Sequence, residues 1–194
     1  MQQEVLTRAQ RRRATTDAKI AEATLAIALS DGVPAVTIDA VSQRSGVAKT
    51  TIYRRYADRL DLMKGVLEQF GSPVPIPPGG SPKDDAIAII GEIRDVFEEQ
   101  VGLASVGTLL ASADPFLREA AERIVRPHLR LVEEQIRTGV EAGHFRDGVD
   151  PRLLVELLFG GLIASATLRE EVPDDWVTQV IDLIWPLIAV DAGS

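Results

Sequence analysis

The stretch "TIDAVSQRSGVAKTTIYRRY" (Thr37–Tyr56) has the spacing of a helix-turn-helix unit. Two short segments of helical pattern flank Gly46, and glycine readily adopts the left-handed backbone needed in the turn between them. Val41, Val47 and Ile52 are spaced so that both helices bury apolar side chains against each other. The sequence therefore predicts a second helix that the first one holds in place, as a helix entering the DNA major groove requires.

Polar and basic side chains occupy the remaining positions of this unit. The candidates for facing a DNA groove are Lys49, Thr50, Tyr53 and Arg54. Hydroxyl groups and cations at helix ends contact phosphate, which positions a protein on DNA without reading its sequence. The candidates for phosphate contact are Thr37, Thr51, Tyr53, Arg55 and Arg59. The alternative interpretation is an exposed basic helix of an ordinary helical bundle.

Charge is distributed unevenly along the chain of 194 residues, whose net charge is −8. Residues 1–60 contain ten basic and six acidic residues, whereas residues 61–194 contain eleven and twenty-three. This asymmetry indicates a basic working end on an acidic body. A second basic cluster, Arg8–Arg13, is either a solvated, frayed arm or an arm that becomes ordered on phosphate or in the minor groove.

The composition excludes several kinds of site. The chain has no cysteine, which removes disulfides and thiolate chemistry, and only two histidines. Glu141 and His144 have the spacing found in di-metal bundles, but the second such motif is missing because Val125 precedes His128 by three residues. No nucleophile-elbow signature is present. We therefore expect no metal, no cofactor and no enzyme, and a cytoplasmic protein without an apolar stretch long enough to span a membrane.

Helical periodicity dominates the chain, which predicts an all-α fold of about nine helices. Expected helices run over residues 16–29, 37–45, 48–56, 58–70, 82–101 and 102–113, with three more starting at Asp114-Pro115, Asp150-Pro151 and Asp174. The chain divides into a helix-turn-helix domain of residues 1–60 and a ligand-binding and dimerisation domain of residues 61–194. The helix at about 58–70 is expected to bridge the two.

The segment "TIDAVSQRSGVAKTTIYRRYADRLDLMKGVL" (Thr37–Leu67) resembles the N-terminal domain of the TetR family of transcriptional regulators. The match extends from Ile20 to Leu67, about a quarter of the chain, and Ser42 departs from it where the motif usually has alanine. The resemblance implies base reading by Lys49 and Thr50 and phosphate contact by Thr37, Thr51, Tyr53, Arg55 and Arg59, with Arg54 suited to either role. It also implies a homodimeric repressor on palindromic double-stranded DNA that a small-molecule inducer releases.

The body of the chain offers two further candidate sites. A ligand cavity is expected from residues along two helices: Phe97, Leu110, Ile124, His128, Leu131 and Gln135. His128 and Gln135 are the polar members of an apolar stripe, so they either face a small ligand or occupy rim or core positions. A dimer interface is expected from the last two helices: Leu158, Gly161, Leu162, Ser165, Val177, Ile181 and Ile184. The alternative is that these residues form the core of a monomer.

A rival function is a helical protein-interaction module whose helix-turn-helix unit no longer binds DNA. The basic and aromatic residues Lys49, Tyr53 and Arg59 argue against it, since an interaction module has no need of them. Loss of all DNA binding even at low salt would favour the rival.

Overall fold

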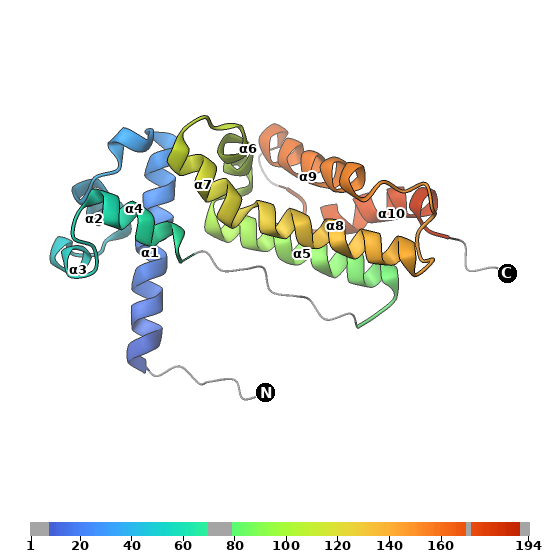
Figure 1. Ribbon diagram of the computed structural model, residues 1–194, viewed down its shortest axis with the longest axis horizontal. Helices are drawn as coiled ribbons and strands as arrows, with labels where there is room; N and C mark the ends of the chain where they lie inside the picture. The colour runs from blue at the N-terminus through green and yellow to red at the C-terminus, as the bar shows by residue number, and fades with distance from the viewer. Residues whose placement is uncertain (1–7, 70–78, 170–171, 191–194) are drawn as a thin grey trace. The chain divides into compact units, whose positions relative to one another are not determined.

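The computed structural model describes residues 8–69, 79–169 and 172–190 (Figure 1). Within these ranges the chain forms ten α-helices and one short 3-10 helix, and the sole β-type pairing is an isolated bridge between Phe145 and Ala189. The predicted all-α fold is therefore confirmed. The helices divide into two compact units: residues up to 69 together with 108–123, and residues 79–107 together with 124–190.

The first unit is built around its longest helix. Its elements are α1 (Arg8–Ser30), η1 (Val33–Ala35), α2 (Ile38–Ser45), α3 (Lys49–Tyr53) and α4 (Arg59–Leu67), joined by most of α7 (Pro115–Ile124). Helix α1 packs against α2, η1 and α4, and α2 packs against α3. Ile20, Val41, Ile52 and Leu62 are completely buried between these helices. The two halves of the predicted helix-turn-helix unit are thus held by one small core.

Local hydrogen bonds fix the turn between α2 and α3. The Thr37 hydroxyl caps α2 by accepting a hydrogen bond from the Ala40 N–H at 3.1 Å, and Gly46 ends that helix with a φ of 68°. Both features were predicted from the sequence. The Ser42 hydroxyl donates a 2.7 Å hydrogen bond to the Val47 carbonyl across the turn. The residue that departs from the family pattern therefore ties α2 to the start of α3.

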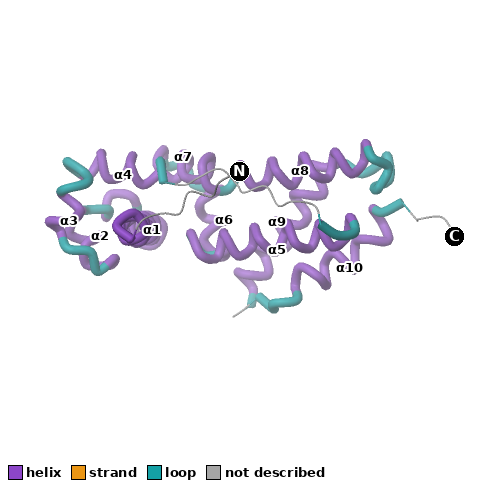
Figure 2. Tube along the Cα trace, turned by 90° about the horizontal axis from the view of Figure 1, so that it is seen from below, coloured by secondary structure: helices purple, strands orange, loops and turns teal. Residues whose placement is uncertain are grey.

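The second unit is a bundle of four long helices. These are α5 (Pro82–Gln100), α8 (Arg126–Glu141), α9 (Pro151–Leu168) and α10 (Trp176–Ile188). The first half of α6 (Leu103–Ala111), which follows α5 in the chain, also belongs to this unit. Helix α5 packs against α8 and α10, and α8 packs against α9 (Figure 2). Phe97, Ile93, Leu162 and Ile181 are among its most deeply buried large side chains.

Several predicted helix bounds were wrong, each for a local reason. Helix α1 begins at Arg8 instead of residue 16, so the arginine cluster is helical from Arg8 onwards and is not a frayed arm. The long helix expected after Asp114 breaks at Val125 into α7 and α8. Pro127 lies in the first turn of α8, where its missing N–H and its ring prevent continuation from the preceding turn. Helix α10 begins at Trp176, after Asp175, and not at Asp174.

Helix α9 is long and apolar enough to cross a membrane on length and composition alone. The helix contains Arg152 and Glu156, so it is not an uninterrupted apolar stretch of the kind that the sequence analysis excluded. A core helix of a globular protein meets the same two criteria, and α9 packs against α8 along one face. One helix of this kind is weak evidence for a membrane span.

Candidate functional site

The exposed face of α3 carries the residues predicted to meet DNA. Lys49, Thr50, Tyr53 and Arg54 are exposed, whereas Ile52 on the opposite face is fully buried. Tyr53 exposes 55% of its surface, so its ring contributes little to the core of this unit. Burial of Ile52 fixes the rotation of α3 and therefore which side chains point outward.

Lys49 forms an ion pair with Asp39, the first-turn acid of α2. The Nζ atom lies 2.8 Å from Asp39 Oδ1, and both side chains are more than half exposed. Ion pairs between exposed side chains contribute only about 0–1 kcal/mol, so a base edge or a phosphate can displace Asp39 at little cost. The pair holds the Lys49 ammonium near the start of α3 without burying it.

A cationic hollow lies between the N-terminal half of α1 and α3. It has a volume of about 620 Å³ and is lined by Arg12, Arg13, Thr16, Thr51, Arg54 and Arg55. We call it the arginine hollow. No carboxylate is among these lining residues, and hydroxyl and guanidinium groups are the usual donors to phosphate oxygens. Sequence reasoning missed Arg12, Arg13 and Thr16 as part of this surface, because the arginine cluster was assigned to an arm and not to a helix.

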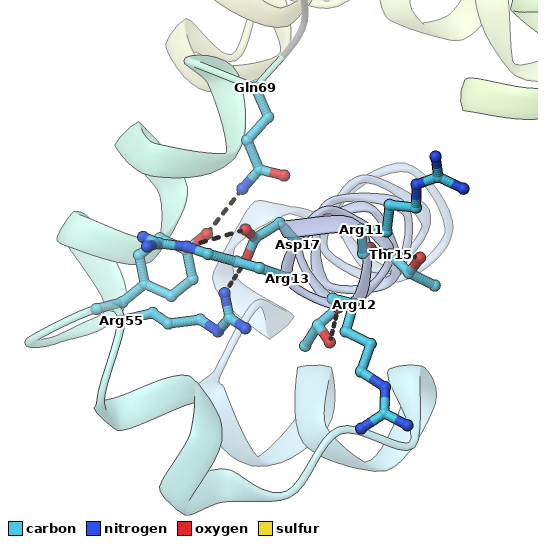
Figure 3. A network of polar contacts seen from close by, with 9 residues as sticks. Arg11, Arg12, Arg13, Thr15, Asp17, Arg55 and Gln69 are labelled. Atoms are coloured by element: carbon cyan, nitrogen blue, oxygen red, sulfur yellow. Dashed lines mark hydrogen bonds and ion pairs between the residues drawn. The ribbon is translucent and has the colours of Figure 1, made fainter. Parts of the chain in front are cut away.

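Asp17 links α1 to the end of α3 through an ion pair with Arg55 (Figure 3). The Arg55 side chain is only 14% exposed and that of Asp17 is 23% exposed. Arg13 approaches the other carboxylate oxygen, with its Nε atom 3.8 Å from Asp17 Oδ2. Arg55 therefore anchors the two helices while it lines the arginine hollow.

Arg59 has a comparable internal role. Its Nε and Nη2 atoms donate 2.6 Å hydrogen bonds to the carbonyls of Val36 and Val33. These N–H groups of Arg59, like the paired guanidinium of Arg55, are already engaged within the chain. Both side chains therefore brace the helix-turn-helix unit, and their contact with phosphate stays a prediction.

Tyr56 connects the end of α3 to α4. Its ring is buried and its hydroxyl accepts a 2.7 Å hydrogen bond from the Gln69 amide. Burial, followed by the charge of Asp17, raises the pKa of the Tyr56 phenol above its usual value. Gly65 allows this packing, because a Cβ atom there would lie 2.5 Å from the Tyr56 ring. The second tyrosine of the basic stretch is thus part of the core and not of the exposed face.

The second unit encloses a cavity of about 510 Å³ between α5, α8, α9 and α10. Its walls are mostly aliphatic, with Phe145 and Trp185 as aromatic members and Gln135, Thr138, His144 and Asp85 as polar ones. Hydrogen bonds join the loop after α8 to the end of α10. The Arg146 guanidinium donates them to the Ala189 and Pro186 carbonyls at 2.9 and 3.1 Å. These bonds hold Phe145 and Trp185 in edge-to-face contact at the cavity wall.

Of the six residues predicted to line a ligand cavity, only Gln135 does so in the described chain. Phe97, Ile124 and His128 are buried in the core, and the rings of Phe97 and His128 meet edge to face at 5.3 Å. His128 Nδ1 lies 2.7 Å from the Ile124 carbonyl, and burial lowers the pKa of the ring. Leu131 is half-buried away from the cavity lining, and Leu110 belongs to the other unit. His128 is therefore a core histidine whose Nδ1 is satisfied by its own helix.

The predicted dimer interface is also mostly internal. Leu158, Leu162, Ser165, Val177 and Ile181 are all buried within the single chain. Ile184 lines the cavity, and Gly161 lies against the Trp176 ring. The prediction therefore identified the inward faces of α9 and α10, which is the monomer-core alternative.

The outward faces of the same two helices carry unpartnered leucines. On α9 these are Leu153, Leu157 and Leu168, which are 53%, 65% and 83% exposed, and on α10 they are Leu183 and Leu187, which are 75% and 72% exposed. Gly160 and Ala164 are exposed on α9 as well, so a neighbouring backbone can approach closely there. Several large apolar side chains exposed along a helix, as on α9 and α10, are typical of a protein–protein interface.

A helix-turn-helix unit with an exposed basic recognition helix, joined to a separate helical bundle, defines the class of one-component DNA-binding regulators. Comparison with known proteins agrees with this class. A family model described as "Tetracyclin repressor-like, C-terminal domain" matches residues 76–184. The HTH-type transcriptional regulator AqdR of Rhodococcus erythropolis is 30% identical over 182 residues, covering 91% of this chain and 87% of AqdR.

Solved structures share the fold. FadR from Bacillus subtilis in complex with stearoyl-CoA aligns with a TM-score of 0.60 at 18% identity, covering 86% of this chain and 96% of FadR. A putative fatty acid metabolism regulator of Clostridium perfringens aligns with a TM-score of 0.64 at 19% identity, covering 86% and 94%. The chain belongs to the TetR family and is an HTH-type transcriptional regulator; its relatives are regulators and not enzymes.

Proposed function

We propose that this protein is a cytoplasmic, homodimeric repressor that binds a palindromic operator and leaves it when a small molecule binds the second unit. The observation that carries the proposal is the pairing of the exposed α3 face with the arginine hollow on one small unit. Exposed polar side chains on a recognition helix read base edges, and flanking guanidinium groups hold phosphates.

The proposed roles of the site residues are base recognition and phosphate contact. Lys49 and Thr50, at the start of α3, read bases; a lysine there favours the O6 and N7 acceptors of guanine. Thr37, Thr51 and Tyr53 contact phosphate, and Arg54 serves either purpose. Arg12 and Arg13 add phosphate contacts that the helical start of α1 supports. Arg55 and Arg59 act mainly by holding α3 and α4 in position, and the terminal guanidinium N–H groups that have no partner within the described part of the chain contact phosphate.

The proposed dimer forms through the outward leucines of α9 and α10. One helix-turn-helix unit makes few contacts, and two units on half-sites about 34–36 Å apart supply the rest. Removing five exposed leucines from water in each subunit is favourable, since each buried leucine contributes about 1.5–3 kcal/mol. Leu157→Glu should therefore yield monomers in sedimentation velocity runs. Leu60→Glu, at a residue 62% exposed in α4, is the matched control and should leave the oligomeric state unchanged.

DNA binding is tested with the promoter region beside the gene and a scrambled duplex, by fluorescence anisotropy over a salt series. Lys49→Ala should reduce the preference for the promoter by about 1–3 kcal/mol, whereas Tyr53→Phe should weaken binding to both duplexes about equally. Arg12→Ala should reduce the slope of log affinity against log salt by about one. Arg123→Ala removes a cation that pairs with Glu119 on α7 and is the charge-matched control.

The competing function, an interaction module without DNA binding, makes the opposite prediction. It requires no binding to either duplex even at low salt, and no difference between Arg12→Ala and Arg123→Ala. Such a result would leave the exposed Lys49 and Tyr53 without the role proposed here.

A further inference from the structure

The cavity of the second unit has the size and lining of a small-molecule site. Its volume of about 510 Å³ lies within the roughly 300–1,000 Å³ typical of such sites. Its deep wall consists of aliphatic side chains that are all buried: Ile89, Ile90, Val132, Leu154, Leu158 and Ile181. A molecule that fills this space gains from burial of apolar surface, and the wall offers nothing to a polar one.

The polar lining residues are exposed or half-buried and therefore lie where the cavity opens. Among the described residues, neither the Gln135 amide nor the Thr138 hydroxyl has a side-chain hydrogen-bond partner, and both are exposed. Because the deep wall is apolar and the opening is polar, the complementary ligand has an apolar body and one hydrogen-bonding head.

The charge at the opening discriminates between kinds of head. Asp85 lines the cavity and is half-buried, and its Oδ1 atom accepts hydrogen bonds from the Gly79 and Gly80 N–H groups at 2.9 and 3.0 Å. These bonds hold the carboxylate in place. The lining contains no lysine or arginine, and the nearby Lys83 is paired with Asp182 at 2.7 Å. An anionic head would therefore meet a fixed like charge without a compensating cation.

We infer that this cavity binds an apolar molecule with an uncharged or cationic head and discriminates against anionic amphiphiles, acyl-CoA included. This inference deepens the proposed function, since the bound molecule would be the effector. It separates this chain from the B. subtilis relative whose structure contains stearoyl-CoA. Three features carry it: the volume, the apolar deep wall and the Asp85 carboxylate at the opening.

The test compares ligands that share one alkyl chain and differ in the head. The full chain, without DNA, is titrated at pH 8 with n-decylamine, n-decanol, n-decanoate and decanoyl-CoA by calorimetry. The fluorescence of Trp185, which lines the cavity, gives a second signal. Decanoate should bind at least about fivefold more weakly than decanol, the factor expected from one like charge about 4 Å away in a watery environment. Decylamine should bind at least as tightly as decanol.

Variants test whether the Asp85 charge causes the discrimination and whether the ligand binds in this cavity. Asp85→Asn keeps an oxygen that accepts the two glycine N–H bonds and removes the charge, so the three simple ligands should then bind within about twofold of one another. Ala86→Phe puts a ring into the cavity and should weaken decanol binding at least tenfold. Ala88→Phe makes the same change at an exposed position of α5 outside the lining and should leave binding unchanged.

Three results would each overturn the inference. The first is decanoate or decanoyl-CoA binding to the unaltered chain as tightly as decanol does. The second is an order of ligand affinities that Asp85→Asn leaves unchanged. The third is no difference in decanol binding between Ala86→Phe and Ala88→Phe. Because binding is measured without DNA, its outcome is independent of the operator. Decanol that binds the cavity without releasing DNA would refute the proposed regulation and leave the ligand class standing.

Discussion

The pair of Asp17 and Arg55 gives the sharpest test of how the DNA-binding unit is held together. Asp17→Asn removes the partner of a guanidinium that is only 14% exposed, and the Arg55 Nε atom is already buried without a hydrogen-bond partner. Leaving a largely buried cation unpaired costs less than the 3–5 kcal/mol of a fully buried one, so we expect a loss of about 2 kcal/mol in the free energy of unfolding. For a chain of this size, about 2 kcal/mol corresponds to a fall of about 4–8 °C in Tm.

The reverse substitution should cost less. Arg55→Gln leaves Asp17 with Arg13 close by, at 3.8 Å, and Asp17 is the more exposed partner at 23%. We therefore expect a loss of only about 1 kcal/mol, close to the net value of one hydrogen bond. The double variant should lose about 2 kcal/mol in total, which corresponds to a coupling energy of about 1 kcal/mol.

Urea unfolding of the four proteins, followed by circular dichroism, measures this cycle. Additive losses would refute the proposed anchoring, because independent residues show no coupling. So would an Arg55→Gln variant with unchanged stability and weakened DNA binding, which is the behaviour of an arginine that serves phosphate alone. Arg123→Ala, at an exposed i,i+4 pair, is the control and should change the free energy of unfolding by less than about 0.5 kcal/mol.

Three further predictions concern the fold. Arg59→Ala removes two charge-assisted hydrogen bonds to backbone carbonyls and should lower the free energy of unfolding by about 2–3 kcal/mol, measured by urea titration; a loss below about 0.5 kcal/mol would contradict the bracing role. Gly139→Ala places a Cβ atom 2.3 Å from the Phe145 ring and should cost about 1–3 kcal/mol by the same measurement, since neither helix nor ring can move freely. Burial lowers the pKa of His128 in the folded protein, which therefore favours the neutral ring. The contribution of His128 to stability is complete above its unfolded pKa of about 6.5 and is lost as the pH falls through its folded pKa. The loss of stability between pH 7.5 and pH 5 should therefore be smaller in His128→Gln than in the unaltered chain.

The helix-turn-helix unit could be predicted from the sequence because its determinants are local. The Thr37 cap, the Gly46 turn and the burial of Ile52 each depend on residues within a few positions along the chain. Propensity and spacing report such interactions directly. The engagement of Arg55 and Arg59 could not be predicted in this way, because their partners lie 38 and up to 26 residues away in sequence.

The rotation of α9 was mispredicted because the helix is apolar on more than one side. Leu157 and Leu158 are adjacent and chemically identical, yet one is 65% exposed and the other 5% exposed. Periodicity cannot choose between two apolar faces, and the choice is made by packing against α8. An exposed leucine row on one face and a buried one on the other is what a helix needs when it contacts its own bundle and a second subunit.

The cavity escaped prediction for a related reason. His128 stood out as a polar residue in an apolar stripe, which is a property of one helix, whereas the cavity is a space left between four helices. The histidine satisfies its Nδ1 within its own helix and needs no ligand. Gln135, two turns further along α8, has no such internal partner among the described residues and does line the cavity. Burial of His128 in the core and exposure of Gln135 where the cavity opens, and not polarity itself, separate the two.

Control of DNA binding through the cavity carries a thermodynamic requirement that can be measured. A ligand shifts a regulator from 99% DNA-competent to 99% released only if it prefers the released form by about ten-thousand-fold. By linkage, operator DNA must then lower the affinity for the ligand by the same factor as the ligand lowers the affinity for DNA. Titrating an effector into the free protein and into its operator complex measures both factors. Equal affinities in the two titrations would show that ligand binding is not coupled to operator binding, and would refute control through the α5–α8–α9–α10 cavity.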